Sequence, residues 1–334
     1  MRKSKTNHES ITARASFPDK KSILTKSAFA AIFILFITFP QVSFKGAAAG
    51  LSLWAKSILP GLFPAAVISS CIMTMLGGEY KHSKAVYAYI FSAGVLCGYP
   101  LGAMLCSEFH KLDPENDSLC EKIMAFCNIS SPSFVVNYIF AMPPFLTAKK
   151  SKILFCIYVP VLIGISAVLV LDMIGRKRAA NKNRKSRILS KTTVRSFEAY
   201  ETYGTRKGIL AEIIDDAILN TVKNMLKLGG YIVIFSCIAA YIVQLPFPNS
   251  TYPAVLCGIT EITNGIFLCS RLNISDNLII ILTLAVNAFG GISTIMQTSG
   301  MIQGSGLSIK KYIYYKLIFT IITIIVSTAA IYVF

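Results

Sequence analysis

VLCGYPLGA, at Val95–Ala103, interrupts an apolar run that extends from Ala85 to Phe109. Glycine, tyrosine and proline in succession favour a break in a helix near membrane depth. In hydrocarbon an unpaired backbone N–H or C=O group costs several kcal/mol, so such a break is stable only inside protein or along a cavity. The four residues VLCG recur at Val255–Gly258 and lead into the breakers and polar groups of GITEITNG. The break is either a packing kink or half of a substrate site, and its recurrence favours the second interpretation.

The composition is that of a polytopic membrane protein. Hydrophobic residues make up 54% of the 334 residues, and several apolar runs are long enough to cross a bilayer. The clearest runs are Ser27–Phe44, Ile153–Ile174, Leu228–Leu245 and Tyr312–Phe334. The sequence contains no GxSxG elbow, phosphate-binding loop or His/Glu metal set, so we do not expect an enzyme. We expect an integral, multi-pass, all-α protein of the cell membrane, with the lipid bilayer as its surroundings.

Two basic segments define the expected domains. Of the net charge of +17, residues 1–26 carry +5 and residues 175–208 carry +9. Beside membrane spans such charge marks cytoplasmic loops in contact with anionic lipid, so nucleic acid is not an expected partner. The expected order is a basic cytoplasmic tail (1–26), a first transmembrane anchor (27–45), one repeat (46–174), a basic cytoplasmic linker (175–208) and a second repeat (209–334).

The two expected repeats follow one plan. Each begins with an amphipathic interfacial helix, at Gly46–Leu59 and at Ile209–Leu226, and continues with a span, a glycine-broken pair, a broken helix and a last span. Short identities occur in the same order in both halves. These are SCI at Ser70–Ile72 and Ser236–Ile238, VLCG as above, LCS at Leu105–Ser107 and Leu268–Ser270, and an asparagine before a break at Asn128 and Asn287.

Loop charge predicts that the repeats are inverted. If every apolar run crossed the membrane, five crossings would place the two basic segments on opposite sides, whereas both are expected in the cytoplasm. The 13 residues of Ala85–Cys97 span only about 20 Å of helix, against a hydrocarbon core of about 30 Å. We therefore expect Ala85–Phe109 to be a re-entrant helical hairpin, with three crossings in each repeat. Inverted-topology repeats with such hairpins and broken transmembrane helices are typical of secondary transporters that bind substrate at the midplane.

The candidate substrate-binding residues lie at the hairpin tips and helix breaks. Glu261 is the one carboxylate deep in an apolar hairpin, which indicates a cation or proton role, with helix capping as the alternative. Ser and Asn at a break either present helix N–H groups to a carboxylate or only cap the helix. Tyr99 either stacks on an aromatic substrate or anchors the tip. The full set is Gly98, Tyr99, Pro100, Asn128, Ser130, Ser131, Ser133, Thr260, Glu261, Thr263, Asn264, Asn287, Gly290, Gly291 and Ser293.

These motifs together resemble a known family. GYPLGA with NISSPSF, then GITEITNG, then FGGIS and KKYIYYKL, are similar to the YlbJ-type sporulation integral membrane proteins. That family belongs with the gate, or nucleoside-recognition, domain proteins, which are distantly similar to concentrative nucleoside transporters. The resemblance covers roughly residues 46–334 and implies a fold with re-entrant hairpins. It also implies export of dipicolinic acid from the mother cell across the outer forespore membrane during sporulation.

The leading expectation is thus a membrane transporter for a small anionic aromatic metabolite. The alternatives are a nucleoside-type carrier and a non-transporting membrane component of spore envelope assembly. No cofactor or metal is expected, while a coupling cation or proton stays open. The sequence also leaves the oligomeric state open, with a homo-oligomer as one alternative.

Overall fold

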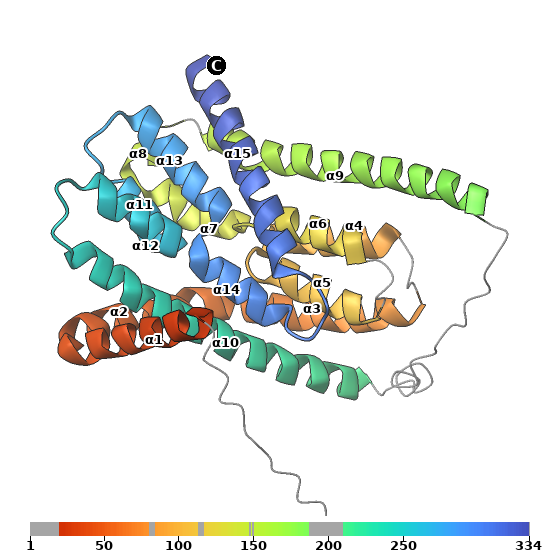
Figure 1. Ribbon diagram of the computed structural model, residues 1–334, viewed down its shortest axis with the longest axis horizontal. Coiled ribbons are helices and arrows are strands. Elements are labelled where there is room, and N and C mark those ends of the chain that lie inside the picture. Colours follow the sequence, from red (N-terminus) through yellow and green to blue (C-terminus); the bar gives the residue numbers. More distant parts are fainter. Residues whose placement is uncertain are drawn as a thin grey trace, which may run out of the picture.

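A computed structural model describes residues 20–79, 84–112, 117–146, 148, 150–186 and 210–333. Within these residues the chain is all-helical (Figure 1). Most of the expected tail and linker lies outside this range. Residues 175–186 of the expected linker continue a long helix instead, because RKRAANKNRKS consists largely of good helix formers and lacks glycine and proline after Gly175.

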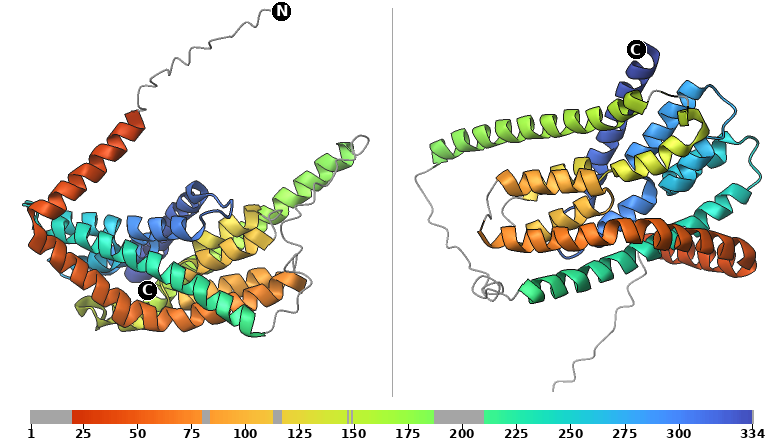
Figure 2. Two further views of the ribbon diagram at one scale, coloured as in Figure 1. Left: turned by 90° about the horizontal axis from the view of Figure 1, so that it is seen from below. Right: turned by 180° about the vertical axis from the view of Figure 1, so that it is seen from behind.

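The first helix of the first half, α1, differs from the others in its direction. The α1 helix projects away from the bundle (Figure 2). The bounds are α1 Lys20–Thr38, α2 Pro40–Leu53, π-helix η1 Trp54–Ile58, α3 Leu59–Glu79, α4 Lys84–Cys97, α5 Leu101–Leu112, α6 Asp117–Cys127, α7 Pro132–Asn137, 3₁₀-helix η3 Ile139–Ala141, α8 Pro143–Leu146 and α9 Lys150–Ser186.

The second half repeats the order of a long helix, a helix pair, an interrupted helix and a long final helix. Its bounds are α10 Leu210–Gln244, α11 Thr251–Thr260, α12 Ile262–Cys269, α13 Asp276–Phe289, α14 Gly291–Met301 and α15 Ile309–Val333. The α4–α5 pair opens toward the right-hand end of Figure 1 and the α11–α12 pair toward the left-hand end, so that both tips lie near the middle.

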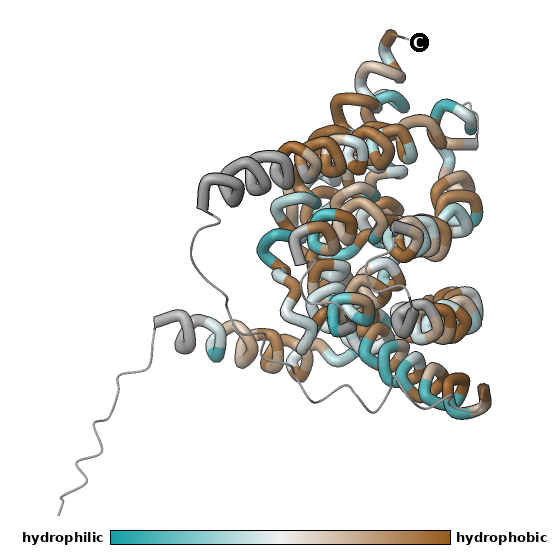
Figure 3. The backbone as a smooth tube through the Cα atoms, turned by 90° about the vertical axis from the view of Figure 1, so that its right-hand side faces the viewer, coloured by the Kyte–Doolittle hydropathy of each residue, from teal (hydrophilic) through white to brown (hydrophobic). Residues whose placement is uncertain are grey.

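Six helical segments of the described chain are long and apolar enough to cross a membrane. They are Pro40–Met75, Leu119–Ala141, Lys150–Leu171, Leu210–Gln244, Asp276–Met301 and Ile309–Val333. Many of their large apolar side chains, such as Leu171 and Ile325, are exposed. Apolar residues accordingly extend along the outside of the bundle (Figure 3), as expected for helices in contact with lipid. Three segments precede residues 187–209 and three follow them.

The expected first span, Ser27–Phe44, is not one helix. It is divided at Phe39, whose φ of −123° and ψ of 65° are not helical, and α2 begins at Pro40. Proline disfavours helical geometry in the residue before it and is well tolerated at the first position of a helix.

The expected interfacial helix Gly46–Leu59 is not a separate helix, since it forms part of the long segment Pro40–Met75. The N–H group of Leu59 bonds to the Trp54 carbonyl in a π turn, directly before Pro60. A π turn takes up the displacement that a proline imposes, so the helix continues through Pro60 and Pro64.

The second expected interfacial helix, Ile209–Leu226, is described from Leu210 onward, where it is likewise continuous with the next span in α10. Its buried positions recur every three or four residues without interruption, as a helix with one packed face requires. They include Ala217, Thr221, Met225, Leu228 and Ile232.

The two long helices, α2–α3 and α10, pack antiparallel along most of their length. Ser43 contacts the Tyr241 hydroxyl at 2.7 Å, the Trp54 indole donates to the Met225 carbonyl at 3.1 Å, and a Cβ atom on Gly46 would lie 2.6 Å from the Cα atom of Cys237. Small residues allow this close approach, as in GxxxG-type crossings.

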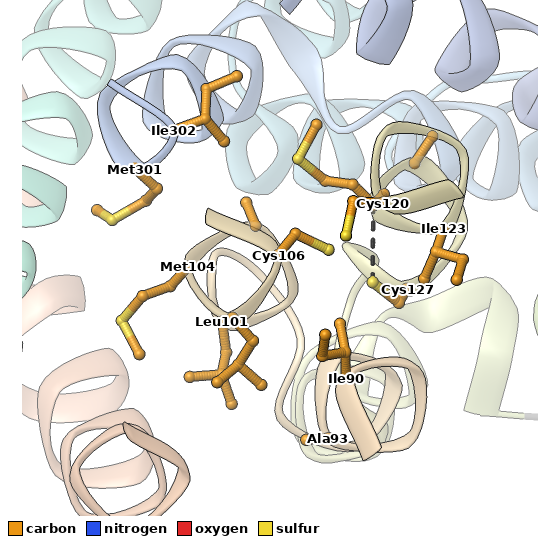
Figure 4. Packing of buried hydrophobic residues seen from close by; sticks show 14 of the residues in the cluster. Ile90, Ala93, Leu101, Met104, Cys106, Cys120, Ile123, Cys127, Met301 and Ile302 are labelled. Carbon is orange, nitrogen blue, oxygen red and sulfur yellow. Dashed lines mark hydrogen bonds between the residues drawn. The ribbon is translucent and has the colours of Figure 1, made fainter. Parts of the chain in front are cut away.

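The helix pairs are held together by glycines in both halves. A Cβ atom on Gly94 would lie 3.0 Å from the Gly102 Cα atom, and one on Gly265 would lie 2.3 Å from the Gly258 Cα atom. The absence of a side chain at these positions therefore allows the two helices of each pair to pack closely. The first pair continues into the largest apolar core, where side chains of α4, α5 and α6 meet Met301 and Ile302 of the second half (Figure 4).

Candidate functional site

The tip of the first pair packs against the break between α6 and α7. Gly98 has a φ of +78°, and a Cβ atom there would lie 2.5 Å from the Ser131 backbone nitrogen. The backbone N–H group of Tyr99 donates to the Ile129 carbonyl at 2.9 Å, and the peptide bond to Pro100 is cis. A glycine is required at this position because only glycine combines a left-handed backbone with so close a neighbour.

Side chains at the first break reach the second half of the chain. Asn128 is fully buried, and its Nδ2 donates to Thr298 Oγ1 at 2.9 Å and to the Tyr312 hydroxyl at 3.2 Å. Ser130 Oγ donates to Asn287 Oδ1 at 2.7 Å, which joins the two interrupted helices directly. The Asn128 amide nitrogen and the Ser130 hydroxyl are thus bonded inside the protein, whereas Asn128 Oδ1 is buried without a hydrogen-bond partner among the described residues.

Ser131 and Ser133 have local roles. The Ser131 hydroxyl accepts from the Phe134 N–H group at 3.2 Å and caps α7. Ser133 is exposed, and its hydroxyl accepts from Asn137 Nδ2 at 3.1 Å. Ser133 therefore lies away from the residues that meet at the breaks.

The second break meets both tips. Gly290 and Gly291 each have a φ of +80° and separate α13 from α14. A Cβ atom on Gly290 would lie 2.8 Å from the Tyr99 hydroxyl, and one on Gly291 would lie 3.1 Å from the Glu261 backbone nitrogen. Ser293 is buried one turn further, where its hydroxyl accepts from Gln297 Nε2 at 2.9 Å.

Glu261 is the N-cap of α12. Its carboxylate is buried and accepts from the Thr263 and Asn264 N–H groups at 3.0 and 2.8 Å, and from the Thr263 hydroxyl and Asn264 Nδ2 at 2.5 and 2.8 Å. A carboxylate at this position compensates the partial positive charge of a helix N-terminus. The geometry accordingly fits the capping alternative, and the cation or proton role stays a prediction. The Thr260 hydroxyl donates to the Leu256 carbonyl within its own helix.

The residue that the sequence reasoning missed is Lys316, in α15. Its side chain is fully buried, and its ammonium group donates to the Asn128 carbonyl at 2.9 Å. The same nitrogen lies 4.8 Å from the ring centroid of Tyr99 and 5.1 Å from that of Phe319. An ionisable residue inside an apolar span is by itself a functional signal, and KKYIYYKL at Lys310–Leu317 contained that signal.

The structure thus brings seven of the fifteen expected residues into one place. Tyr99, Asn128, Ser130, Asn287, Gly290, Gly291 and Glu261 come from both tips and both breaks. This place combines a buried cation with hydroxyl and amide groups, and the starts of α12 and α14 lie there. Such groups bind the carboxylate of a small anion.

Comparison with known proteins agrees with the resemblance expected from the motifs. The sporulation integral membrane protein YlbJ of Bacillus subtilis (strain 168) is 24% identical to this chain over 327 residues, covering 89% of this chain and 79% of that protein. No family model and no solved structure matches the chain. The similarity supports a YlbJ-type family, and with its six apolar segments the chain is an integral membrane protein of several spans.

Proposed function

We propose that this chain is a transporter for small aromatic anions, with dipicolinate as the substrate that it exports across the outer forespore membrane. The observation that carries the proposal is the meeting of two helix-pair tips and two helix breaks around polar groups and a buried cation. In secondary transporters such breaks form the substrate site near the midplane. The similarity to a sporulation membrane protein supports the same setting.

The proposal includes two inverted repeats whose helix pairs are re-entrant. Three observations support it. The corresponding long helices α2–α3 and α10 pack antiparallel. The helix pairs open at opposite ends of the molecule (Figure 1). Three of the six candidate spans lie on each side of residues 187–209. An odd number of crossings in each repeat inverts the second relative to the first.

Cysteine labelling tests this topology in a variant that lacks the native cysteines. Ala85 and Lys111 flank the first helix pair, Asn249 and Asn273 flank the second, and all four are exposed. With single cysteines introduced at these positions, a membrane-impermeant thiol reagent should label Ala85 and Lys111 from one side and Asn249 and Asn273 from the other. Labelling of the two ends of one pair from opposite sides would contradict the re-entrant hairpins.

In the proposed cycle the contacts between the halves open the site alternately to each side. Few polar contacts join the two breaks, chiefly Ser130 with Asn287 and Asn128 with Thr298. A small number of such bonds is compatible with two arrangements of similar free energy, because each contributes only about 0.5–1.5 kcal/mol net. Glu261 maintains the start of α12 throughout, since both of its oxygens already accept hydrogen bonds.

Transport is tested in vesicles that contain the purified full chain. Wild-type vesicles should move labelled dipicolinate, and Asn287→Ala should lower the rate about tenfold. The substitution leaves the buried Ser130 hydroxyl without its acceptor, which destabilises the arrangement in which the two breaks meet by roughly 1–3 kcal/mol. A free-energy change of about 1.4 kcal/mol corresponds to a tenfold change in an equilibrium constant. Asn277→Ala, at an exposed position of the same helix, is the matched control and should transport normally.

The same assay separates the alternatives. Movement of uridine rather than dipicolinate would identify a nucleoside-type carrier. No flux of either compound, together with loss of spore dipicolinate when the protein is absent, would identify a non-transporting component of envelope assembly.

A further inference from the structure

Lys316 is a buried cation without a carboxylate partner. Within the part of the chain that the structure describes, the hydrogen bond of its ammonium group is to the Asn128 carbonyl, and it forms no ion pair. By contrast, the buried carboxylate of Glu121 pairs with Lys311 at 2.6 Å. Burying an ammonium group without a counter-charge is costly. An anion from outside the chain would remove much of that cost.

A second buried group points to the same place. The Tyr99 hydroxyl is buried, and among the described residues it has no hydrogen-bond partner. The Lys316 ammonium lies over the ring of this tyrosine, and the hydroxyl reaches the start of α14 at Gly290. A buried hydroxyl without a partner loses roughly 1–3 kcal/mol relative to a paired one. A ligand oxygen would satisfy it.

The start of α14 completes the arrangement. This helix of 11 residues begins at Gly291 with no side-chain cap, and Gly290, Gly291 and Ser293 are buried. The start of α12 differs, since Glu261 supplies a carboxylate to its N–H groups. Of these two helix starts at the candidate site, one therefore carries its own anion and the other does not. An uncapped helix N-terminus attracts a carboxylate.

We propose that the Lys316 ammonium, the Tyr99 hydroxyl and the first N–H groups of α14 together bind a carboxylate group of the transported molecule. This assignment rests on the proposed transport function and specifies its substrate class as small organic carboxylates. Lysine contributes the charge, and the tyrosine hydroxyl and helix start contribute directed donors. Glu261 excludes a carboxylate from the equivalent start of α12.

Binding to the purified full chain in detergent tests the assignment by titration calorimetry. The ligands are dipicolinate, its single-carboxylate analogue picolinate, and the uncharged pyridine-2,6-dicarboxamide. Wild type should bind both carboxylates and not the diamide. Lys316→Met should weaken dipicolinate binding at least tenfold, and Tyr99→Phe should weaken it several-fold. The matched control is Lys310→Met, at an exposed lysine of the same helix, which should bind like wild type.

Each outcome decides the assignment. The assignment is overturned if wild type and Lys316→Met bind dipicolinate with equal affinity. It is also overturned if wild type binds the diamide as tightly as dipicolinate, or if it binds neither carboxylate. If Lys316→Met does not fold, Tyr99→Phe decides, and unchanged affinity in that variant overturns the assignment. If carboxylates bind in a way that depends on Lys316 but no flux occurs in vesicles, the transport function is refuted and the binding site is supported. Dipicolinate flux that is unaffected in Lys316→Met would refute the site and leave the transport function standing.

Discussion

Gly265→Val is expected to prevent most of the protein from reaching its folded form. A Cβ atom at this position would lie 2.3 Å from the Cα atom and 2.8 Å from the backbone nitrogen of Gly258, in the facing helix of the pair. Backbone atoms of a packed helix cannot rotate away as a side chain can. Helices α11 and α12 would have to separate, which moves the Glu261 cap and its contact with Gly291. Overpacking of this kind costs typically 1–3 kcal/mol, occasionally more.

The loss is measured as the fraction of monodisperse protein that survives heating, followed by size-exclusion chromatography with fluorescence detection. Gly230→Val is the matched control, because a Cβ atom at Gly230, within α10, meets nothing within 4 Å. We expect the control to differ little from wild type. Equal survival of the two variants would show that α11 and α12 do not pack as closely as described.

Asn128→Asp is expected to lower dipicolinate transport strongly while the protein still folds. The substitution places a carboxylate on the residue whose carbonyl accepts from the Lys316 ammonium at 2.9 Å. Thr298 and Tyr312, which accept hydrogen bonds from the Asn128 amide, have hydroxyl groups that can donate to the new carboxylate. The lysine would then have an anion within the chain. At an effective dielectric constant of 20, unit charges 4 Å apart attract by about 4 kcal/mol.

The internal carboxylate competes with substrate for the same cation, so we expect the rate of dipicolinate flux to fall at least about tenfold. Asn137→Asp is the control, because Asn137 is exposed at the end of α7 and adds the same charge away from Lys316. Thermal midpoints of both variants should remain near that of wild type. Normal flux in Asn128→Asp, with folded protein in normal amount, would exclude Lys316 as the substrate-binding charge.

The positions of the breaks follow from local backbone chemistry and were predictable. Gly98 and Gly290 adopt left-handed φ values, and the chain leaves helical geometry at GYP, NISSP and FGG, where the sequence indicated it would. The membrane class and the apolar segments were predictable for a similar reason, since hydrophobic length is a property of a continuous stretch. The site residues stood out because polar groups inside such stretches are costly.

Helix continuity was less predictable. A proline or a polar run normally indicates a boundary, yet α3 continues through Pro60 and Pro64 and α10 through its polar first turns. Tertiary packing outweighed local preference in both helices, because Trp54 and Gly46 lie against Met225 and Cys237 over a long antiparallel contact. Contacts between residues about 170 positions or more apart in the chain cannot be predicted from the pattern of neighbouring residues.

Local chemistry along the chain therefore established a helical membrane protein with two breaks and two broken pairs, since each break depends on a few neighbouring residues. Which groups meet there depended on the packing of distant segments. The bond of Ser130 to Asn287, the Tyr99 hydroxyl against Gly290 and the buried Lys316 beside Asn128 each join residues from different halves of the chain. A lysine in an apolar span indicates function because burying its charge is costly. Only the folded arrangement leaves Lys316 without a carboxylate partner among the described residues and places it over the Tyr99 ring, whose hydroxyl lies against the uncapped start of α14. This uncompensated positive charge favours an anion at the site.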